Sequence, residues 1–502
     1  MSTDVIIIGG GHNALVAATL LAKRRKKVLL LEARDEVGGA AAPRTFHKGY
    51  TLPGLLHETR GFRPEVESEL GLKRHGFSRR SERGECYAPV EGESGLWILG
   101  DSLRGEGLSD EDRATFKEHH AFVGRLSKVI RKVMTSPAPD PLGSPWPLLT
   151  MGLSVRMLGE RDMIELARVA PTCAADWMRD RFSSERLCAA LASRAVHFGY
   201  VGPWAANTAA NLLVDDCLDF GEVQGGPAAV VAALRAAAEA AGVEIRTEAR
   251  VTNLIIKRDA VRGVRLESGE EIESSCIGAG VDPRTLFLDM IGTRQLEVPF
   301  AQRARNIRAR GSAAKVHLAL KGPLLDSEGK PIERMLTGET LDDVERAFDA
   351  LKYGEMSERP ALDVWVPTQV GAGAAPEGHH VVSILAHAAP FALKGGWDDD
   401  ARELLKSRVL DELSRYCPEV RDLVVGSETL TPADLADEYG LSEGNLMHVE
   451  HAPDQLLFMR PTIECGSHNT PIEGLFLCGS GAHPGGGVTG APGLLGARAL
   501  LS

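Results

Sequence analysis

The sequence predicts an α/β fold that opens with a Rossmann-type nucleotide-binding unit and continues into a second domain. Three observations predict this fold. The N-terminal residues have the pattern of a buried strand, a glycine-rich turn, a helix and a second buried strand. Residues 227–241 form an alanine-rich helical stretch, and short alternating runs typical of strands follow up to residue 272. The chain has 502 residues, 43% of them hydrophobic, and single cores rarely exceed about 250 to 300 residues, so we expect two domains.

The first motif is the stretch DVIIIGGGHNALVAATLLA at residues 4–22. Gly9, Gly11 and Ala14 have the spacing GxGxxA between an apolar strand and a helix of small residues. Gly9 permits the tight turn, and Gly11 lets a pyrophosphate approach the helix N-terminus. Ala14 allows close packing of the helix against the strand. The motif predicts a dinucleotide-binding βαβ unit.

The next strand, VLLLEA, leads into Glu32, whose carboxylate can accept hydrogen bonds from an adenosine ribose. The alternative is an ordinary glycine turn followed by a surface glutamate. Between helix and strand lies the basic run KRRKK at residues 23–27. We interpret this run as a solvated helix C-terminus, where the helix dipole favours cations.

Composition excludes several classes of function. The chain has 57 Lys and Arg against 69 Asp and Glu, a formal charge of -12, which argues against nucleic acid as a partner. Its eight cysteines form no CxxC pair, so we expect no zinc site, no disulfide framework and reduced thiols. A strand that starts at residue 4 leaves no room for a targeting peptide, so we expect a cytoplasmic protein.

Several segments together resemble a known family of flavoproteins. They are EARDEVGGAA at 32–41, the helix and strands of 225–272, AGVDPRTLF at 279–287, the stretch 430–461 that contains DQLLFMRP, and GSGAHPGGGVTGAPG at 479–493. The chain resembles phytoene desaturase-related FAD-dependent oxidoreductases. Within that group it is most similar to the branch called pyridine nucleotide-disulphide oxidoreductase domain-containing protein 2.

The resemblance implies a Rossmann-type FAD-binding domain interleaved with an α+β substrate-binding domain. The FAD-binding domain would comprise residues 1–70, 215–300 and 455–502, and the substrate domain residues 71–214 and 301–454. The cofactor would be non-covalent FAD.

The resemblance also implies which residues hold the cofactor. In the C-terminal loop, Gly479 and Ser480 would lie by the ribityl and pyrophosphate portion, and 487–489 by the pyrimidine edge of the ring. Ser480 stands where many related flavoproteins carry an acid, so its ribityl contact would be a neutral hydrogen bond. Val251 would contact the adenine. The complete set is Gly9, Gly11, His12, Asn13, Ala14, Glu32, Ala33, Gly38, Gly39, Ala40, Ala41, Val251, Gly479, Ser480, Gly487, Val488 and Thr489.

The implied activity is desaturation or isomerisation of an apolar isoprenoid or polyene substrate by hydride transfer to the flavin. Two alternatives stay open. A flavin amine oxidase shares the fold but usually frames its flavin with aromatic rings, and only 5% of this chain is aromatic. A non-catalytic flavoprotein with a binding role is the other. A disulfide reductase is excluded, because it needs a redox cysteine pair and a second nucleotide fold.

Two histidines are candidate proton-handling groups: His483, inside the glycine loop, and His57, after the PGLL stretch that the family places near the ring. We expect Asp454 and Arg460 to form an ion pair within the DQLLFMRP motif. The adjacent His119 and His120 point to different helix faces, and we interpret both as structural.

One long helix and one apolar stretch complete the prediction. Ser109 with an acid three residues later resembles a capping box, and apolar residues at helical spacing predict a helix over 109–134. Five prolines within 137–147 should end it. The stretch WPLLTMGLSVRML at 146–158 is predicted to be a buried loop and helix, with a substrate-channel lip or a membrane-surface contact as the alternative.

Overall fold

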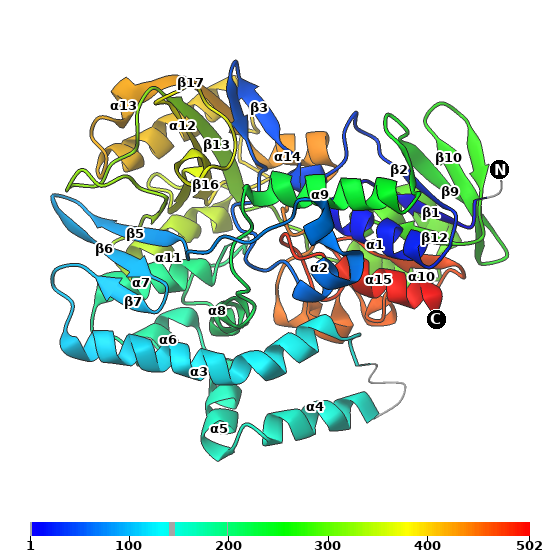
Figure 1. Ribbon diagram of the computed structural model, residues 1–502, viewed down its shortest axis with the longest axis horizontal. Helices are drawn as coiled ribbons and strands as arrows, with labels where there is room; N and C mark the ends of the chain where they lie inside the picture. Colours follow the sequence, from blue (N-terminus) through cyan, green and yellow to red (C-terminus); the bar gives the residue numbers. More distant parts are fainter. Residues whose placement is uncertain (1–2, 140–145, 198) are drawn as a thin grey trace.

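A computed structural model describes residues 3–139, 146–197 and 199–502 of the chain. Two bodies lie side by side in Figure 1: the body on the right contains both chain termini, and the body on the left is built on a large mixed sheet. The segments that build the right-hand body come from the beginning, the middle and the end of the sequence. This arrangement confirms the predicted α/β class.

A five-stranded parallel sheet forms the centre of the right-hand body. The two strands that come first in the sequence, β1 (Val5–Ile8) and β2 (Val28–Leu31), are fully buried, as expected for a parallel sheet with both faces covered. The third strand along the sheet, β1, pairs with β12 on one side and β2 on the other. The strand order is β18 (Leu475–Leu477), β12 (Ile277–Ala279), β1 (Val5–Ile8), β2 (Val28–Leu31) and β8 (Glu244–Arg246).

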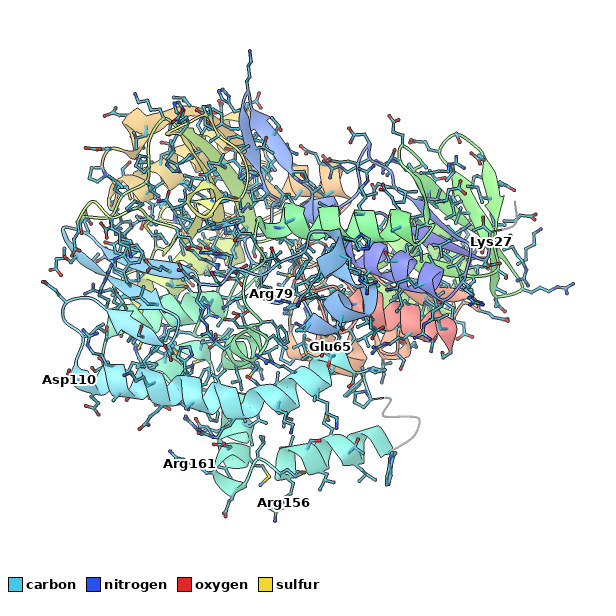
Figure 2. The ribbon with its side chains drawn as sticks, in the orientation of Figure 1. Lys27, Glu65, Arg79, Asp110, Arg156 and Arg161 are labelled. Carbon is cyan, nitrogen blue, oxygen red and sulfur yellow. The ribbon has the colours of Figure 1, made fainter. Side chains whose placement is uncertain are left out.

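Three helices pack together on this sheet: α1 (His12–Lys23), α9 (Gly226–Ala240) and α15 (Ala491–Leu501). A Cβ on Gly493 of α15 would lie 2.0 Å from the Asn13 carbonyl oxygen, so only glycine permits this approach of α15 to α1. Helix α1 ends at Lys23, and the rest of the basic run is exposed, with Lys27 at the periphery in Figure 2. The predicted solvated helix end is confirmed.

The other face of the sheet carries an antiparallel sheet of three strands in the predicted region: β9 (Val251–Lys257), β10 (Ala260–Leu266) and β11 (Glu271–Glu273). Apolar side chains of β9 and β10 share one core cluster with β1 and β2. The alternating strands predicted up to residue 272 are therefore present.

An eight-stranded mixed sheet forms the left-hand body. The second strand along this sheet, β13 (Ala313–Leu320), is buried along its whole length, and antiparallel strands flank it on both sides. The strand order is β17 (Val424–Leu430), β13 (Ala313–Leu320), β16 (His380–His387), β15 (Leu362–Trp365), β14 (Arg334–Leu336), β5 (Glu85–Val90), β6 (Glu93–Leu99) and β7 (Ser102–Arg104).

Helix α3 (Asp110–Thr135) is the predicted long helix. The Ser109 side chain accepts a hydrogen bond from the Asp112 backbone N–H at 2.9 Å, which satisfies one of the free donors at the helix start. The remaining elements are β3 (Arg44–His47), β4 (Tyr50–Leu52), α2 (Pro64–Leu70), α6 (Ala174–Arg179), α7 (Glu185–Arg194), α8 (Thr208–Cys217), α10 (Val298–Arg305), α11 (Leu341–Asp349), α12 (Asp399–Ser414), α13 (Val420–Leu423) and α14 (Pro432–Tyr439).

Helices α4 (Trp146–Arg156) and α5 (Glu160–Val169) project below α3, away from both sheets (Figure 1). The prediction that this stretch is buried was wrong, because Leu153 is 62% exposed and Met157 is 80% exposed. Its apolar composition does not reflect burial against the rest of this chain. Most of the proline-rich stretch before α4 lies outside the described residues. Among the residues with assigned positions, every helix is too short or too polar to cross a membrane.

Candidate active site

The turn between β1 and α1 forms an open cradle at the end of the parallel sheet. Gly9 has φ +87°, a conformation that glycine adopts without strain. Gly11 is the N-cap of α1, and a Cβ added there would meet no atom within 4 Å. Free space therefore lies against the helix N-terminus, where backbone N–H groups favour a phosphate. The cradle fits a dinucleotide.

Glu32 follows β2 and is only 8% exposed. Its carboxylate accepts hydrogen bonds from the Gly10 N–H at 2.5 Å and the Arg34 N–H at 2.8 Å. An ionised carboxylate has about four acceptor positions, so acceptor positions remain for ribose hydroxyls. The geometry agrees with a ribose-binding role and also shows that Glu32 helps to hold the glycine turn.

The C-terminal glycine loop lies directly against the start of α1. Asn13 Nδ2 donates to Ser480 Oγ at 3.0 Å, and His12 Nε2 lies 3.0 Å from the Gly487 carbonyl oxygen. The Arg63 N–H donates to the Thr489 carbonyl at 3.0 Å. The Asn13 Oδ1 atom is buried without a hydrogen-bond partner in the described part of the chain, so an acceptor remains free for a ligand. Both ends of the sequence thus meet at one cradle.

The other predicted cofactor residues lie on the same side of the sheet or beside it. Ala33, Gly38, Gly39, Ala40 and Ala41 follow β2, and the Leu55 N–H donates to the Ala40 carbonyl at 2.8 Å. Gly38 has φ +123° and packs tightly, since an added Cβ would lie 2.8 Å from Val231. Val251 begins β9 and is buried. Close to it, the Ala249 N–H donates to the Glu32 carbonyl at 2.8 Å.

The predicted ion pair between Asp454 and Arg460 was wrong. Asp454 pairs with Arg308, at 2.5 Å. Arg460 is fully buried, and its guanidinium donates to backbone carbonyls before and within the glycine loop. Burial lowers its pKa to about 9. The six acceptors are the carbonyl oxygens of Met447, Val449, Glu450, Gln455, Ser480 and Ala482. Arg460 therefore fixes the beginning of the loop.

His483 is fully buried and does not line the cavity described below. Its Nε2 lies 3.1 Å from the Ser136 carbonyl oxygen, just beyond the end of α3. Desolvation is the main cause that lowers the pKa of His483 to about 3. A neutral imidazole in this position ties the loop to α3.

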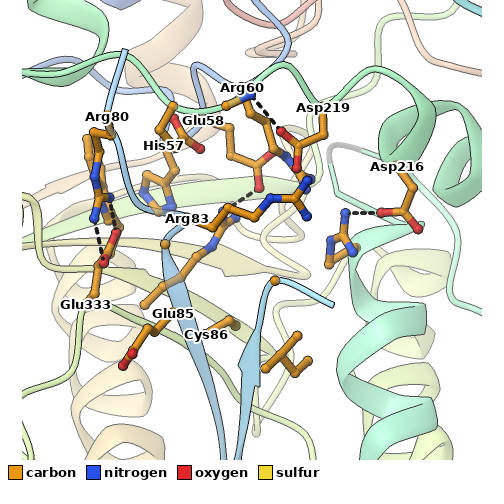
Figure 3. A pocket seen from close by; sticks show the side chains of 18 of the residues that line it. His57, Glu58, Arg60, Arg80, Arg83, Glu85, Cys86, Asp216, Asp219 and Glu333 are labelled. Atoms are coloured by element: carbon orange, nitrogen blue, oxygen red, sulfur yellow. Dashed lines mark hydrogen bonds and ion pairs between the residues drawn. The ribbon is translucent and has the colours of Figure 1, made fainter. Parts of the chain in front are cut away.

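A cavity of about 290 Å³ is lined mainly by the left-hand body, by α3, β5 and β14, and by the segment after Pro53. Gly226, at the start of α9, also lines it. Its lining contains six arginines and six carboxylates, and these charged side chains outnumber the apolar ones. Figure 3 shows Arg80 joined to Glu333 on one side of the cavity, with Glu58, Arg60 and Asp219 above it. The cavity therefore presents many charged groups among apolar side chains.

His57 lines this cavity and belongs to a buried polar cluster. Its Nε2 contacts Lys315 Nζ and lies 3.1 Å from Ser383 Oγ. Its Nδ1 lies 3.5 Å from Asp363 Oδ2, and Asp363 is paired with Arg334 at 2.7 Å. Burial lowers the pKa of His57 to about 4 and the pKa of Lys315 to about 7. The cluster can accept a proton near neutral pH.

Three residues of this cluster were not predicted from the sequence: Lys315, Asp363 and Arg334, which lie on β13, β15 and β14. The signal that could have identified Lys315 is its place in AAKVHLAL, a mostly apolar strand with a charge at its third position. His119 and His120, predicted to be structural, both line the cavity. His119 Nε2 lies 3.6 Å from Asp216.

Comparison with known proteins identifies the family. The NAD(P)-binding Rossmann-like domain matches residues 7–66, and the flavin containing amine oxidoreductase family matches residues 109–493, more than half of the chain. Among curated proteins, pyridine nucleotide-disulfide oxidoreductase domain-containing protein 2 of Rattus norvegicus is 29% identical, with 92% of this chain and 87% of the relative covered. The zeta-carotene-forming phytoene desaturase of Myxococcus xanthus is 24% identical, with 61% and 57% covered.

Solved structures agree on the fold. An oxidoreductase from Methanosarcina mazei has a TM-score of 0.62 at 16% identity and covers 99% of both chains. A redesigned putrescine oxidase has a TM-score of 0.63 at 17% identity and covers 100% of this chain and 98% of its own. The glycine cradle, the acid after β2 and the matched family together mean that the chain belongs to the flavin containing amine oxidoreductase family and is an FAD-dependent oxidoreductase.

Proposed function

We propose that the protein dehydrogenates a small molecule bound in the cavity beside His57, with hydride transfer to FAD. The observation that carries this proposal is the position of His57. It lies at the wall of the cavity, follows the PGLL stretch, and contacts Lys315 of the large sheet. The cavity and a proton-accepting cluster therefore meet at one place.

The domain division proposed with this function follows the cofactor segments. Residues 1–70, 215–300 and 455–502 would bind FAD, and residues 71–214 and 301–454 would bind substrate. The cradle at Gly11, the carboxylate of Glu32, the Asn13 amide and the loop 479–489 would hold the cofactor. Bound FAD supplies the hydride acceptor.

The chain's own residues would position the substrate and accept its proton. Lys315 is fully buried, and its lowered pKa leaves a large neutral fraction near neutral pH. His57, which contacts Lys315, has a pKa of about 4, so it is neutral near pH 7 and can accept a hydrogen bond from the Lys315 amine. The indole of Trp365, with its centroid 5.6 Å from that of His57, helps to exclude water from the cluster.

Two substrate classes have support. The names of phytoene desaturases, and of a limonene dehydrogenase component from Castellaniella defragrans that is 25% identical over 53% of this chain, support an isoprenoid. The matched family name supports an amine, the alternative kept open by the sequence. The charged lining of the cavity favours the polar substrate, because a hydrocarbon in contact with ionised side chains would remove their water without replacing its hydrogen bonds.

The test is an anaerobic reductive half-reaction with the FAD-loaded protein. Bleaching of the flavin by a polyene would support desaturation, and bleaching by an amine would support amine oxidation. Lys315→Met should slow the reduction by on the order of 100-fold with FAD occupancy unchanged, in line with general-base contributions. A flavin that no substrate class reduces would favour the non-catalytic alternative.

We also propose a peripheral membrane contact through the projecting helices. Support comes from the exposed apolar side chains Leu149, Leu153 and Met157, which lie on α4 or directly after it. Figure 2 shows Arg156 and Arg161 at the outer edge of the same two helices, where they could meet anionic lipid. Co-sedimentation with anionic vesicles, compared between wild type and Leu153→Ser, tests this contact. Equal binding of both proteins would refute it.

A further inference from the structure

The charges that line the cavity fall into two groups. Four of the six lining arginines form ion pairs: Arg80 with Glu333, Arg60 with Glu58, Arg194 with Asp216 and Arg334 with Glu58. Four of the six lining carboxylates are also paired. Glu58, Asp216 and Glu333 pair with these arginines, and Glu85 pairs with Lys330, which does not line the cavity. Glu58 serves both Arg60 and Arg334, and these two arginines pair in addition with Asp215 and Asp363. Each of these charged groups therefore has an ionic partner in the protein and requires no ligand.

Two arginines and two carboxylates of the lining form no ion pair with any residue that the structure describes: Arg83, Arg131, Asp219 and Glu222. Arg83 is exposed to water and needs no partner in the cavity, whereas Arg131, Asp219 and Glu222 are partly buried. An occupant that carries one negative and one positive group would give a partner to charges of both signs.

Arg131 is the best placed of the four to bind a carboxylate. Its Nε donates to the Cys217 carbonyl at 2.7 Å, its Nη2 donates to the Asp219 carbonyl at 2.8 Å, and its guanidinium lies 4.4 Å from the centroid of the Phe220 ring. Its Nη1 has no hydrogen-bond partner within the described ranges. The guanidinium is therefore fixed in place with donors to spare, the arrangement that suits carboxylate recognition.

The same face of α3 leaves room for an occupant. His120, Gly124, Ser127 and Arg131 recur at intervals of three and four residues and all line the cavity. A Cβ added at Gly124 would meet no atom within 4 Å, so the same face of the helix is open about two turns before Arg131.

The two acids supply the opposite charge. Asp219 accepts one hydrogen bond, from the Gly221 N–H at 2.8 Å. Glu222 accepts from the Thr59 N–H at 2.9 Å and from the Thr59 hydroxyl, both through Oε2, so its other carboxylate oxygen stays available. Burial and the nearby Glu58 raise the pKa of Glu222, so a cation beside it would relieve an unfavourable environment. A buried ammonium group would be that cation.

We propose that the cavity binds a small zwitterion, with its carboxylate on Arg131 and its ammonium group near Asp219 and Glu222. This inference rests on the proposed function and names the substrate class for that site. A volume of about 290 Å³ lies at the lower end for ligand pockets, which agrees with a compact molecule.

The test measures binding of four probes of matched length to the FAD-loaded protein by calorimetry: 6-aminohexanoate, hexanoate, hexylamine and hexan-1-ol. We expect 6-aminohexanoate to bind about tenfold or more tightly than each of the others. Arg131→Gln should weaken 6-aminohexanoate and hexanoate about tenfold and leave hexylamine unchanged. Asp219→Asn should weaken 6-aminohexanoate and hexylamine and leave hexanoate unchanged.

The control is Arg113→Gln on the same helix. Arg113 also donates to two loop carbonyls, those of Leu103 and Gly105, but does not line the cavity, so its loss should not change probe binding. Equal or tighter binding of hexan-1-ol, no binding of any probe, or an equal effect of Arg113→Gln and Arg131→Gln would overturn the proposal. Because binding is measured without turnover, a protein that binds the zwitterion but cannot pass electrons to FAD would refute the proposed function alone.

Discussion

Replacing Lys315 by methionine should stabilise the protein at neutral pH. The side chain is fully buried on β13, and burial lowers its pKa from 10.5 to about 7. Between about pH 7 and 10.5 the unfolded chain therefore holds a proton on Lys315 that the folded chain has partly or wholly released. Stability of the wild type should rise with pH through this window, because the unfolded state binds more protons.

The size of the effect follows from the same shift. Each pKa unit corresponds to about 1.4 kcal/mol, so at pH 7 the buried lysine costs at most roughly 4 to 5 kcal/mol of folding free energy. Methionine has a similar length, carries no charge and packs flexibly. Lys315→Met should recover part of this cost, about 2 to 4 kcal/mol, and the variant should lose the rise in stability above pH 7.

Urea unfolding at several pH values measures both quantities. The matched control is Lys321→Met, since Lys321 follows β13 directly and is exposed. It should leave the pH dependence unchanged. A Lys315→Met variant that is less stable than wild type at pH 7, or that keeps the wild-type pH dependence, would show that the lysine is held in its charged form by Asp363 and that our account of the cluster is wrong.

Three further outcomes are expected. Glu32→Ala should weaken FAD binding by about 1 to 3 kcal/mol through lost ribose hydrogen bonds, measured by flavin release on dilution; unchanged affinity would contradict the ribose assignment. Gly487→Val should alter the flavin spectrum and abolish turnover, because a β-branched residue is strained at φ +86° and its side chain would enter the space beside the loop. An unaltered spectrum would place the flavin elsewhere. His483→Ala should lower the free energy of unfolding by about 1 to 3 kcal/mol and change turnover less than tenfold, because the neutral His483 ring ties the loop to Ser136. A 100-fold loss of turnover with FAD still bound would instead assign proton transfer to His483.

The parts of the fold that could be predicted from the sequence are those that local rules determine. The turn at Gly9 and Gly11, the cap at Ser109 and the helix after Gly490 each depend on residues close together in the chain. Their chemistry is visible without any knowledge of distant contacts. The resemblance added the place of the glycine loop, and hydrogen bonds from Asn13 and His12 bring that loop to the start of α1.

The proton-accepting cluster could not be predicted in the same way. Lys315, Asp363 and Arg334 lie on three strands that come together only through the order β13, β16, β15 and β14. The ion pair assigned to Asp454 and Arg460 failed for a related reason. Proximity in sequence suggested it, whereas the fold supplies Arg308 from a distant segment and surrounds Arg460 with carbonyls.

The buried charges of the large sheet also bear on function. Taking ionised groups out of water costs several kcal/mol for each ion unless partners and hydrogen bonds compensate, and apolar residues at the same positions are often neutral or stabilising. Asp363 and Arg334 compensate one another, but no carboxylate pairs with Lys315 among the residues that have assigned positions, and its nearest polar contact is a neutral histidine. A lysine kept in this position lowers stability without strengthening the sheet. We infer that its place beside His57 and the cavity serves the chemistry of the site, where a group that exchanges a proton near neutral pH is useful.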